Sequence, residues 1–233
     1  MFMTGLEIYY YFIAAFYTIL PPIFIVSYIY KKDLYDKEPG KIIRKCFLYG
    51  ILIALPVVFL EIFIKKTGVF AESIFLYSFF GVALIEEGGK LYALMKYPFK
   101  LKDFNEPYDG ILYSATIGLG FAFIENILYV LGNLDMAREI AMGRMFTAIP
   151  AHAAFGVLMG YFVGLAKFDL KNKTRLVITG LVIATSTHCL YNYFIFKFSN
   201  SIYMLFTFVV LIIALYLSKI AIKKHQDNSP FKN

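Results

Sequence analysis

The chain has few charged residues and no long polar stretch. Only 17% of its 233 residues are charged, against about a quarter in soluble domains, and 60% are hydrophobic, with a mean hydropathy of +0.66. No segment is polar enough to form a separate soluble domain. Hydrophobic runs long enough to cross a bilayer recur from end to end instead. The composition therefore excludes an ordinary soluble protein and predicts a single-domain, all-α bundle of transmembrane helices over residues 1–233.

Cysteine and early basic residues are also scarce. The two cysteines, Cys46 and Cys189, fall in different hydrophobic runs and do not form a disulfide framework. The first lysine is Lys31, so no basic region precedes the first run, and we expect this run to remain in the mature protein as a membrane span rather than a cleaved signal peptide. The net charge of +7 comes from lysines in short loops, which indicates membrane topology and not nucleic-acid binding.

We predict seven transmembrane helices. The first contains Pro21-Pro22, where we expect a kink. The seven segments are approximately Leu6–Tyr30, Ile42–Ile64, Ser73–Tyr97, Gly110–Leu131, Arg144–Ala166, Leu176–Phe196 and Ser201–Ile222.

Basic residues are distributed unequally between the alternate loops. The segments Lys31–Lys45, Lys96–Lys102, Lys167–Arg175 and Lys219–Lys232 carry 17 Lys and Arg residues, and the opposite set carries 5. Because cytoplasmic loops are enriched in Lys and Arg, the N-terminus is predicted outside and the short polar tail, residues 223–233, in the cytoplasm. The chain is thus expected to be a multi-pass protein of the cell membrane, surrounded by lipid and without a nucleic-acid partner.

Three ionisable residues lie well inside the third predicted span. Glu86 and Lys90 are four residues apart and share a helix face, and Glu87 lies three residues before the lysine. A charge at this depth costs on the order of 2.5–3.5 kcal/mol even on the insertion scale. Such a cost indicates a functional cluster, although an internal ion pair that only joins helices is the structural alternative.

Three further spans carry polar residues. The fourth contains Glu125 and Asn126, the fifth contains His152, and the sixth contains His188 and Asn192 at a spacing that places both on one face. Each could be structural by itself, as a neutral buried carboxyl, a core histidine or an interhelical hydrogen bond. Two of the three histidines of the chain lie in these apolar segments. The combination favours one shared site.

Helical rise places these groups at overlapping depths. At about 1.5 Å per residue, Glu125 lies about 10 Å below the outer end of its helix, His152 and His188 about 12 Å, and Glu86 about 20 Å. Three carboxylates and one lysine leave a net negative site, so either carboxyls are protonated or a divalent cation is bound. Carboxylates and neutral imidazoles are ligands of catalytic zinc, but the chain has no His-Glu-x-x-His motif, and the spacing leaves the metal open.

Two patterns outside the polar set have structural explanations. The segment Asp33-Leu-Tyr-Asp-Lys-Glu-Pro39 is charged and, taken alone, would be a solvated connection. Gly156, Gly160 and Gly164 recur every fourth residue in the fifth span. Small residues at this spacing allow helix backbones to approach closely, so we expect a packing face there.

Between about residues 33 and 193 the sequence resembles the PrsW-type intramembrane proteases. The resemblance covers the Asp33–Pro39 segment, the Glu-Glu-x-x-Lys motif at Glu86, the segment from Asp109 to Asn126, His152-Ala-Ala-Phe-Gly156 with Gly160-Tyr161, and His188-Cys-Leu-Tyr-Asn192. Five such pieces in order, on membrane helices, make the resemblance specific. It extends to the wider group of type II CAAX prenyl endopeptidases.

The resemblance implies peptide hydrolysis inside the membrane. Glu86 or Glu87 is then the general base, Lys90 orients the second carboxylate, and His188 with Asn192 stabilises the oxyanion. The related endopeptidases have a histidine where this chain has Glu125, and the added negative charge favours a metal. A zinc ion would be bound by His152, His188 and a carboxylate such as Glu125, and in that version the oxyanion role passes from His188 to the metal and Asn192.

The resemblance also implies a membrane-protein substrate, such as a single-span anti-sigma factor cut near its extracytoplasmic side to start a signalling cascade. Two other functions are compatible with the residues alone. A proton- or cation-coupled transporter also uses intramembrane Glu, His and Lys, although neither inverted repeats nor matching broken helices are visible. A non-catalytic scaffold or receptor would use the polar groups only to join helices.

Overall fold

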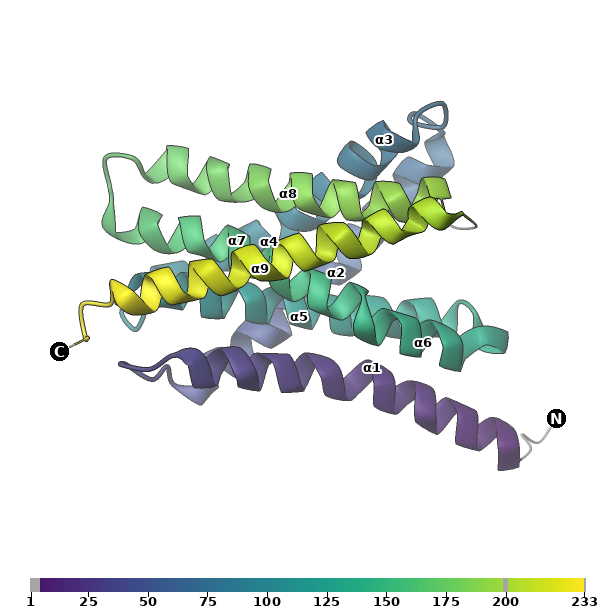
Figure 1. The fold of residues 1–233 in the computed structure, drawn as a ribbon, viewed down its shortest axis with the longest axis horizontal. Helices are drawn as coiled ribbons and strands as arrows, with labels where there is room; N and C mark the ends of the chain where they lie inside the picture. The colour runs from purple at the N-terminus through teal and green to yellow at the C-terminus, as the bar shows by residue number, and fades with distance from the viewer. Residues whose placement is uncertain (1–4, 199–200, 233) are drawn as a thin grey trace.

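The computed structural model describes residues 5–198 and 201–232, with side chains from Phe12 onward. Within these ranges the regular secondary structure is helical and contains no strand. The long helices run along one common direction, and α1 begins at the end of the bundle opposite to that where α9 ends (Figure 1). The fold is therefore the all-α transmembrane bundle expected from the sequence.

The elements, in chain order, are α1 (Gly5–Lys32), α2 (Gly40–Thr67), α3 (Ile74–Leu76), the π-helix η1 (Tyr77–Ala83), α4 (Leu84–Lys96), the short 3-10 turn η2 (Pro98–Lys100), α5 (Pro107–Leu131), the 3-10 turn η3 (Leu134–Met136), α6 (Ala137–Phe146), α7 (Ala148–Phe168), α8 (Lys173–Phe198), the 3-10 turn η4 (Ile202–Met204) and α9 (Leu205–Asp227).

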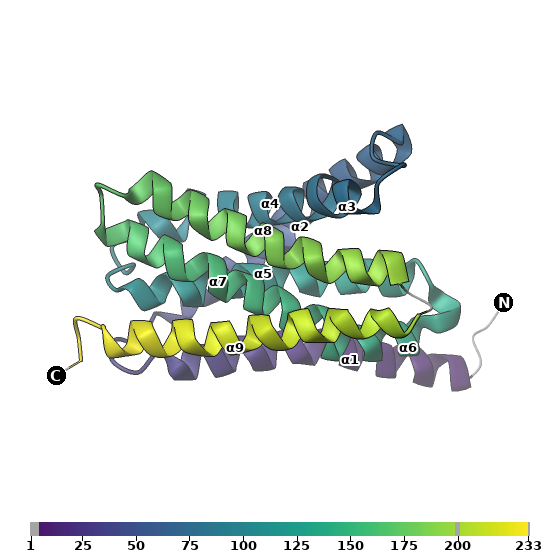
Figure 2. The same cartoon turned by 45° about the horizontal axis from the view of Figure 1, so that its top comes forward.

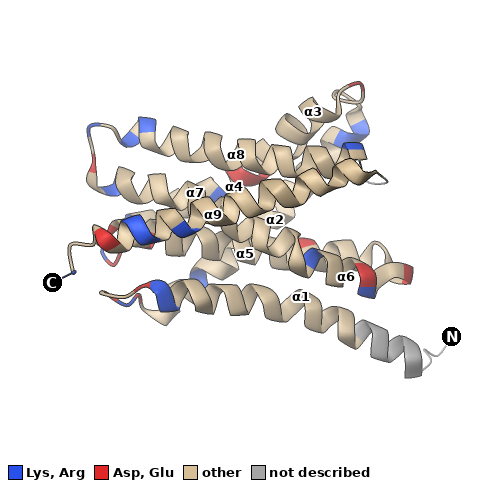
Figure 3. Cartoon of the chain, viewed as in Figure 1, with Lys and Arg blue, Asp and Glu red and all other residues tan. Residues whose placement is uncertain are grey.

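Each of the seven predicted segments coincides with helical structure. Five stretches of the described chain are long and apolar enough to cross a membrane: Phe12–Lys32, Gly40–Thr67, Pro107–Leu131, Leu134–Phe168 and Ile202–Asp227. The two other predicted spans, α3 to α4 and α8, contain the ionisable and polar residues that reduce their hydropathy. Many of the basic residues lie at the end of the bundle where α1 and α9 finish (Figure 3), but the direction in which the protein sits in the membrane stays a prediction.

Helix α1 is continuous through Pro21 and Pro22, and the kink expected there stays a prediction. The fifth span does not begin at Arg144: α6 ends at Phe146, and α7 begins at Ala148 with Pro150 in its first turn. Pro150 fits in this first turn because the first N–H groups of a helix have no intrahelical acceptor. Arg144 consequently lies on the separate short helix α6 and not on α7.

Helices α5 and α7 form the buried centre of the bundle. A Cβ atom at Gly160 would lie 2.2 Å from the Gly110 carbonyl oxygen, and one at Gly164 would lie 2.1 Å from that of Pro107. No side chain fits at these distances, so glycine is required for the two backbones to meet. The expected packing face in the fifth span is confirmed, and it fixes the α7 backbone against α5 on the side of His152 away from the end of α5.

The third predicted span is not one continuous α-helix. It begins as α3, widens into the π-helix η1 and resumes as α4, in which Glu86 and Glu87 occupy the first turn. π-Helical segments are rare and occur frequently at functional sites. In Figure 2, α3 and the adjoining end of α2 diverge from the rest of the bundle. The helix that carries the paired glutamates therefore starts beside a part of the molecule that is less tightly packed.

The connection between α1 and α2 is folded into the bundle. Asp33 is 1% exposed and Glu38 2% exposed, so the expectation of a solvated segment is wrong for these two residues, whereas Leu34, Tyr35 and Lys37 between them are exposed. The Glu38 backbone N–H donates to Asp33, and the Tyr113 hydroxyl donates to the Glu38 carboxyl. With Glu106 and Asp109 these two residues form a second group of buried carboxyls, which we call the basal cluster.

Candidate active site

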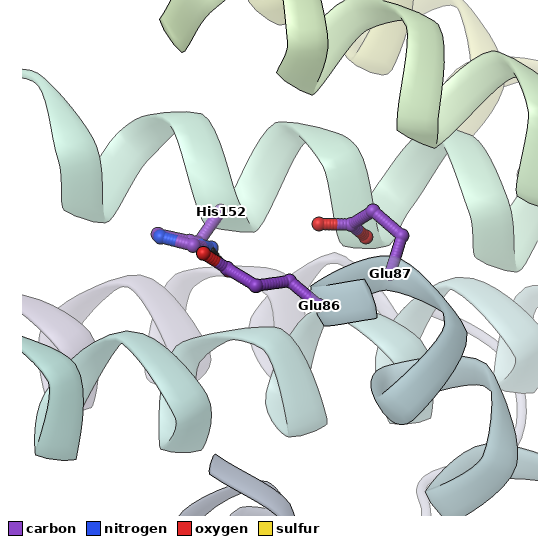
Figure 4. Close-up of side chains that lie close together, drawn as sticks. All are labelled: Glu86, Glu87 and His152. Atoms are coloured by element: carbon purple, nitrogen blue, oxygen red, sulfur yellow. Dashed lines mark ion pairs between the residues drawn. The ribbon is translucent and has the colours of Figure 1, made fainter. Parts of the chain in front are cut away.

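The ammonium group of Lys90 lies at the centre of the intramembrane polar residues. Its Nζ atom is 2.7 Å from Glu87 Oε1, 3.1 Å from Glu86 Oε2 and 2.8 Å from His152 Nδ1. The two glutamates follow one another on α4, and Lys90 is one turn further along that helix, so the α-helical repeat alone aligns these three. The histidine comes from α7. Figure 4 shows Glu86 directed towards His152, with Glu87 on the same helix.

His152 is held between α4 and α5. Its Nε2 atom is 2.9 Å from Glu125 Oε2, while its Nδ1 atom faces the Lys90 ammonium, which has only hydrogens to offer. The arrangement therefore corresponds to a neutral imidazole that donates from Nε2 to Glu125 and directs its Nδ1 lone pair at the centre of the site. Its backbone is fixed too, because a Cβ atom at Gly118 would lie 2.9 Å from the His152 carbonyl oxygen.

His188 joins the site from α8. Its Nδ1 atom is 2.9 Å from Glu87 Oε1, and its Nε2 atom is 3.1 Å from the Asn192 amide nitrogen. The Phe155 ring stacks on the imidazole at a centroid distance of 4.8 Å and limits its rotation. The predicted His188–Asn192 pair is thus formed, and both imidazole nitrogens have partners within the protein.

Glu125 connects the site to α6. Arg144 forms an ion pair with it at 2.8 Å, and the Arg144 guanidinium also donates to Asn126. Asn126 therefore contacts the arginine rather than the central lysine. Seven of the eight sequence-predicted site residues are joined in one network, and Asn126 is linked to it through Arg144.

The network is shielded on most sides. The side chains of Glu86, Glu87 and Lys90 are 0–3% exposed, whereas those of Glu125 and Arg144 are 12% and 18% exposed. A cavity of about 250 Å³ between α2, η1 and α5 is lined by Glu125. Its wall also includes Glu61 and Lys65 from α2, Tyr77 from η1, and Tyr129 and Asn133 at the end of α5. This cavity gives the buried site a route towards the end of the bundle where α2 and α5 finish.

Comparison with known proteins identifies the family. Residues 38–217 match the family model described as PrsW family intramembrane metalloprotease. The chain belongs to the PrsW family. It is 35% identical over 193 residues to "Protease PrsW" of Bacillus subtilis (strain 168), covering 82% of this chain and 87% of that protein. The protein of the same name from Oceanobacillus iheyensis is 37% identical over 203 residues, 86% of this chain and 92% of that one. No solved structure matches the chain.

Membership of the PrsW family shows that this multi-pass membrane protein is a peptidase, an intramembrane protease. The expectation drawn from the resemblance is confirmed in this respect, and the transporter and scaffold alternatives lose their support. The long, apolar helices agree with a site within the membrane. The roles of the individual residues follow from chemistry and are treated below as proposals.

The structure adds two charged residues that the sequence reasoning missed. Arg144 was assigned to a span boundary, because its reach back to Glu125 depends on the α6–α7 break. Glu61 lies in α2, where its carboxyl faces Glu86 and Glu125 and its Oε1 atom is buried without a hydrogen-bond partner. The sequence does indicate Glu61 as a site residue, because it is an acidic residue about 9 Å inside an apolar helix that ends at Thr67.

The PrsW family description includes a metal, and the donor set of this chain fits one. One carboxylate oxygen each from Glu86 and Glu87 and one nitrogen of His152 lie within 4.8 Å of one another. His152 directs a lone pair inwards and is oriented by Glu125, as metal-binding histidines are oriented by a second carboxylate. The Lys90 ammonium lies among these three donors and acts as their cation. A metal ion bound by them requires Lys90 to move away.

This donor set differs from the expected one. The sequence reasoning named Glu125, His152 and His188, of which only His152 belongs to the group that converges. In the described arrangement Glu125 contacts the far nitrogen of His152, and His188 contacts Glu87 and Asn192. The four carboxyls Glu61, Glu86, Glu87 and Glu125 face only two permanent cations, Lys90 and Arg144. The carboxyls therefore outnumber the permanent cations around this site.

Proposed function

We propose that this protein hydrolyses a peptide bond of a membrane-protein substrate with a water molecule activated by a glutamate of the Glu86–Glu87 pair. One observation carries the proposal: donor atoms from α4 and α7 converge on a single cationic position, inside the bundle and beside a cavity. Amide hydrolysis requires a proton acceptor, a stabilised oxyanion and a proton donor for the leaving amine. The site contains a candidate for each.

Glu86 is the better candidate for the general base. Glu87 Oε1 is held by both Lys90 and His188, whereas Glu86 has the longer contact to Lys90 and lies beside Glu61, which lines the cavity. Of the two paired glutamates, Glu86 is therefore the one that a water molecule in the cavity reaches past Glu61. Glu86 takes the proton from this water and later delivers it to the nitrogen of the leaving amine, as a carboxyl that serves first as base and then as acid does.

Asn192 and His188 are the candidates for oxyanion stabilisation. Asn192 is half-buried, and its amide nitrogen has a second hydrogen beyond the one directed at His188. His188 donates from Nδ1 to Glu87, so in this arrangement it positions the glutamate and the asparagine. Asn192 then donates to the developing oxyanion.

Zinc is the metal proposed for this site. Held by Glu86, Glu87 and His152, it would supply a bound water of lowered pKa and polarise the scissile carbonyl. In that version Glu86 is a ligand, so its role as the free general base belongs to the metal-free version of the site. Glu125 and Arg144 would hold His152 in the orientation that it already has. The ligand set implied by the resemblance, Glu125, His152 and His188, is the alternative. The zinc content measured after substitution of each residue distinguishes the two ligand sets.

The proposed substrate is a single-span membrane protein of the anti-sigma-factor type, cut near its outer side. Support comes from the resemblance to PrsW-type proteases and from the cavity, which leads from the site to the end of the bundle predicted to be extracytoplasmic. The lipid bilayer is then the medium through which the substrate reaches the protein.

The proposal is tested with purified protein in lipid nanodiscs and a co-reconstituted single-span anti-sigma factor. Glu86→Gln and Glu125→Gln are expected to abolish cleavage while leaving the folded helical content unchanged. Glu72→Gln is the matched control, because Glu72 is exposed in the turn between α2 and α3. Full cleavage by folded Glu86→Gln and Glu125→Gln proteins would refute the glutamate mechanism.

The metal is tested separately by elemental analysis of the same preparations. We expect about one zinc per chain in the active protein, loss of cleavage after chelation and recovery on addition of zinc. Glu87→Gln and His152→Ala should reduce the bound zinc, and His188→Ala should not. A fully active preparation without metal would remove zinc from the mechanism and leave Lys90 as the resident cation.

A further inference from the structure

Peptide hydrolysis creates two charges inside the bundle. Water adds across the amide, the C–N bond breaks, the carbonyl carbon receives the oxygen, and the nitrogen receives the proton, so that a neutral amide and water become a carboxylate and an ammonium group. Both charges are costly in a low-dielectric interior unless each meets a counter-charge. Given the hydrolysis proposed above, a group beside the site must act as the counter-charge for the new ammonium group.

Among the described carboxylates near the site, Glu61 lacks a cation of its own. Glu86 and Glu87 pair with Lys90, and Glu125 pairs with Arg144. No ion pair of the described residues includes Glu61; its buried Oε1 atom has no hydrogen-bond partner, and its carboxyl otherwise contacts that of Glu86. The carboxyl is also the one that faces both Glu86 and the cavity.

The cavity runs outwards from Glu61. Glu61 and Lys65 are separated by one turn of α2, and Glu125 and Tyr129 by one turn of α5, and all four line the cavity. Its acidic end is therefore next to the site, and Lys65 and Asn133 lie nearer the end of the bundle. A chain segment that leaves by this route passes the Glu61 carboxylate directly after the bond is cut.

We propose that the inner end of this cavity is a subsite for a primary ammonium group, with Glu61 as its counter-charge, and that the new amino terminus of the C-terminal product occupies it. The acidic end of the cavity holds the amino terminus while the remaining product extends towards Lys65 and Asn133. The C-terminal fragment is consequently released at that end of the bundle. A lysine side chain next to the cleaved bond offers the same chemistry and is the other possible source of the ammonium.

The test is a binding measurement that requires no turnover. The probe is a hexapeptide of alternating leucine and alanine with a C-terminal fluorophore, used with a free and with an acetylated amino terminus, and titrated into the protein in nanodiscs. We expect the free amine to bind about tenfold more tightly. Glu61→Gln should reduce this ratio to about one, Glu61→Asp should retain part of it, and Glu72→Gln should leave it unchanged.

A third peptide, acetylated but with lysine as its first residue, distinguishes the two sources. Binding equal to that of the acetylated leucine peptide restricts the subsite to the amino terminus, and tighter binding that Glu61→Gln abolishes assigns it to side-chain ammonium groups as well. Equal affinity of wild-type protein for the free and acetylated peptides would overturn the inference, and that comparison needs no variant. Loss of the glutamate mechanism in the cleavage assay would leave this binding result intact, so the two proposals fail separately.

Discussion

The bundle contains two buried groups of carboxyls that are built differently. In the basal cluster the acceptors receive hydrogen bonds from backbone amides and hydroxyls: Asp109 Oδ2 lies 2.8 Å from the N–H groups of both Asn105 and Glu106, and the Tyr113 hydroxyl donates to Glu38. In the central site the carboxylates meet Lys90, Arg144 and two imidazoles.

The difference shows what each cluster is suited for. Among the described ion pairs none joins a basal carboxyl to Lys or Arg, and burial raises the pKa of Asp33 to about 6 and that of Glu38 to about 7. These carboxyls therefore carry protons readily and tie the α1–α2 connection to α5. The central carboxylates pair with side-chain cations, and Glu61 and Glu125 line a cavity. Carboxyls with amide and hydroxyl partners stabilise the fold, whereas those that pair with Lys and Arg beside a cavity are available for chemistry.

Replacement of one glutamate by glutamine should reduce catalysis far more in the central site than in the basal cluster. Glu86→Gln removes the proposed general base and one partner of Lys90, and we expect cleavage to fall by about 10²–10⁴-fold, the range for loss of a group that acts in proton transfer. Glu38→Gln keeps an acceptor for Tyr113 and should change cleavage per folded molecule by less than about twofold. Initial rates of substrate cleavage in nanodiscs measure the activity of both variants. Equal losses of activity would contradict the assignment of catalysis to the central site and of stability to the basal cluster.

Removal of the central cation should have the largest effect on stability. Lys90→Met leaves adjacent buried carboxylates without a counter-charge, which costs about 3–5 kcal/mol in metal-free protein. Because the vacated position suits a divalent ion, zinc should recover most of this loss. Thermal unfolding in detergent, with and without zinc, gives the answer, and an unchanged melting temperature of the metal-free variant would show that Lys90 is not the required cation.

Loss of a basal carboxylate should be milder and purely structural. Asp109→Ala removes the acceptor for the Glu106 N–H and hence one half of the capping box at the start of α5. A cost of about 0.5–2 kcal/mol is expected, typical of helix-cap losses. Unfolding and cleavage rates are measured on the same preparation, and a changed kcat with unchanged stability would place Asp109 in the reaction.

The smallest effect should be a dependence of stability on pH. The folded-state pKa values of Asp33 and Glu38 are raised above the ordinary values of 3.8 and 4.5 to about 6 and about 7, mainly by burial, with Glu106 raised as well. The folded protein thus binds more protons than the unfolded chain between these limits. The contribution of these protonated carboxyls to the free energy of unfolding is complete below about pH 4 and is lost as the pH rises through about 6 to 7.

The measurement is the melting temperature between pH 5 and pH 8 in wild-type protein and in the Asp33→Asn/Glu38→Gln double variant. We expect stability to decrease with pH in the wild type by an amount on the order of 1–3 kcal/mol and a flatter profile in the variant. Glu72→Gln is the control, because Glu72 is exposed in the turn between α2 and α3, away from the basal cluster. A wild-type stability that increases over this interval would contradict the assigned direction.

Most of the central site could be predicted from the sequence because its helices are regular. Glu86, Glu87 and Lys90 share a face by helical repeat alone, and so do His188 and Asn192. The overlapping depths of Glu125, His152 and His188 followed from span boundaries and helical rise. Arg144 could not be placed in this way, since its position depends on the break between α6 and α7 and not on a repeat.

The sequence by itself determined that this chain is a helical membrane protein, because a bilayer leaves helices as the means by which an apolar chain satisfies its backbone hydrogen bonds. It also determined which ionisable residues lie in the interior, because the free-energy cost of placing a charge there indicates a functional role. Only the tertiary structure decided how they pair: that Lys90 lies among Glu86, Glu87 and His152, that Arg144 holds Glu125, and that Glu61 lies on the cavity wall without an ion-pair partner among the described residues. Pairing across helices depends on crossing distances and on backbone breaks, and neither is encoded in the periodicity of any single helix.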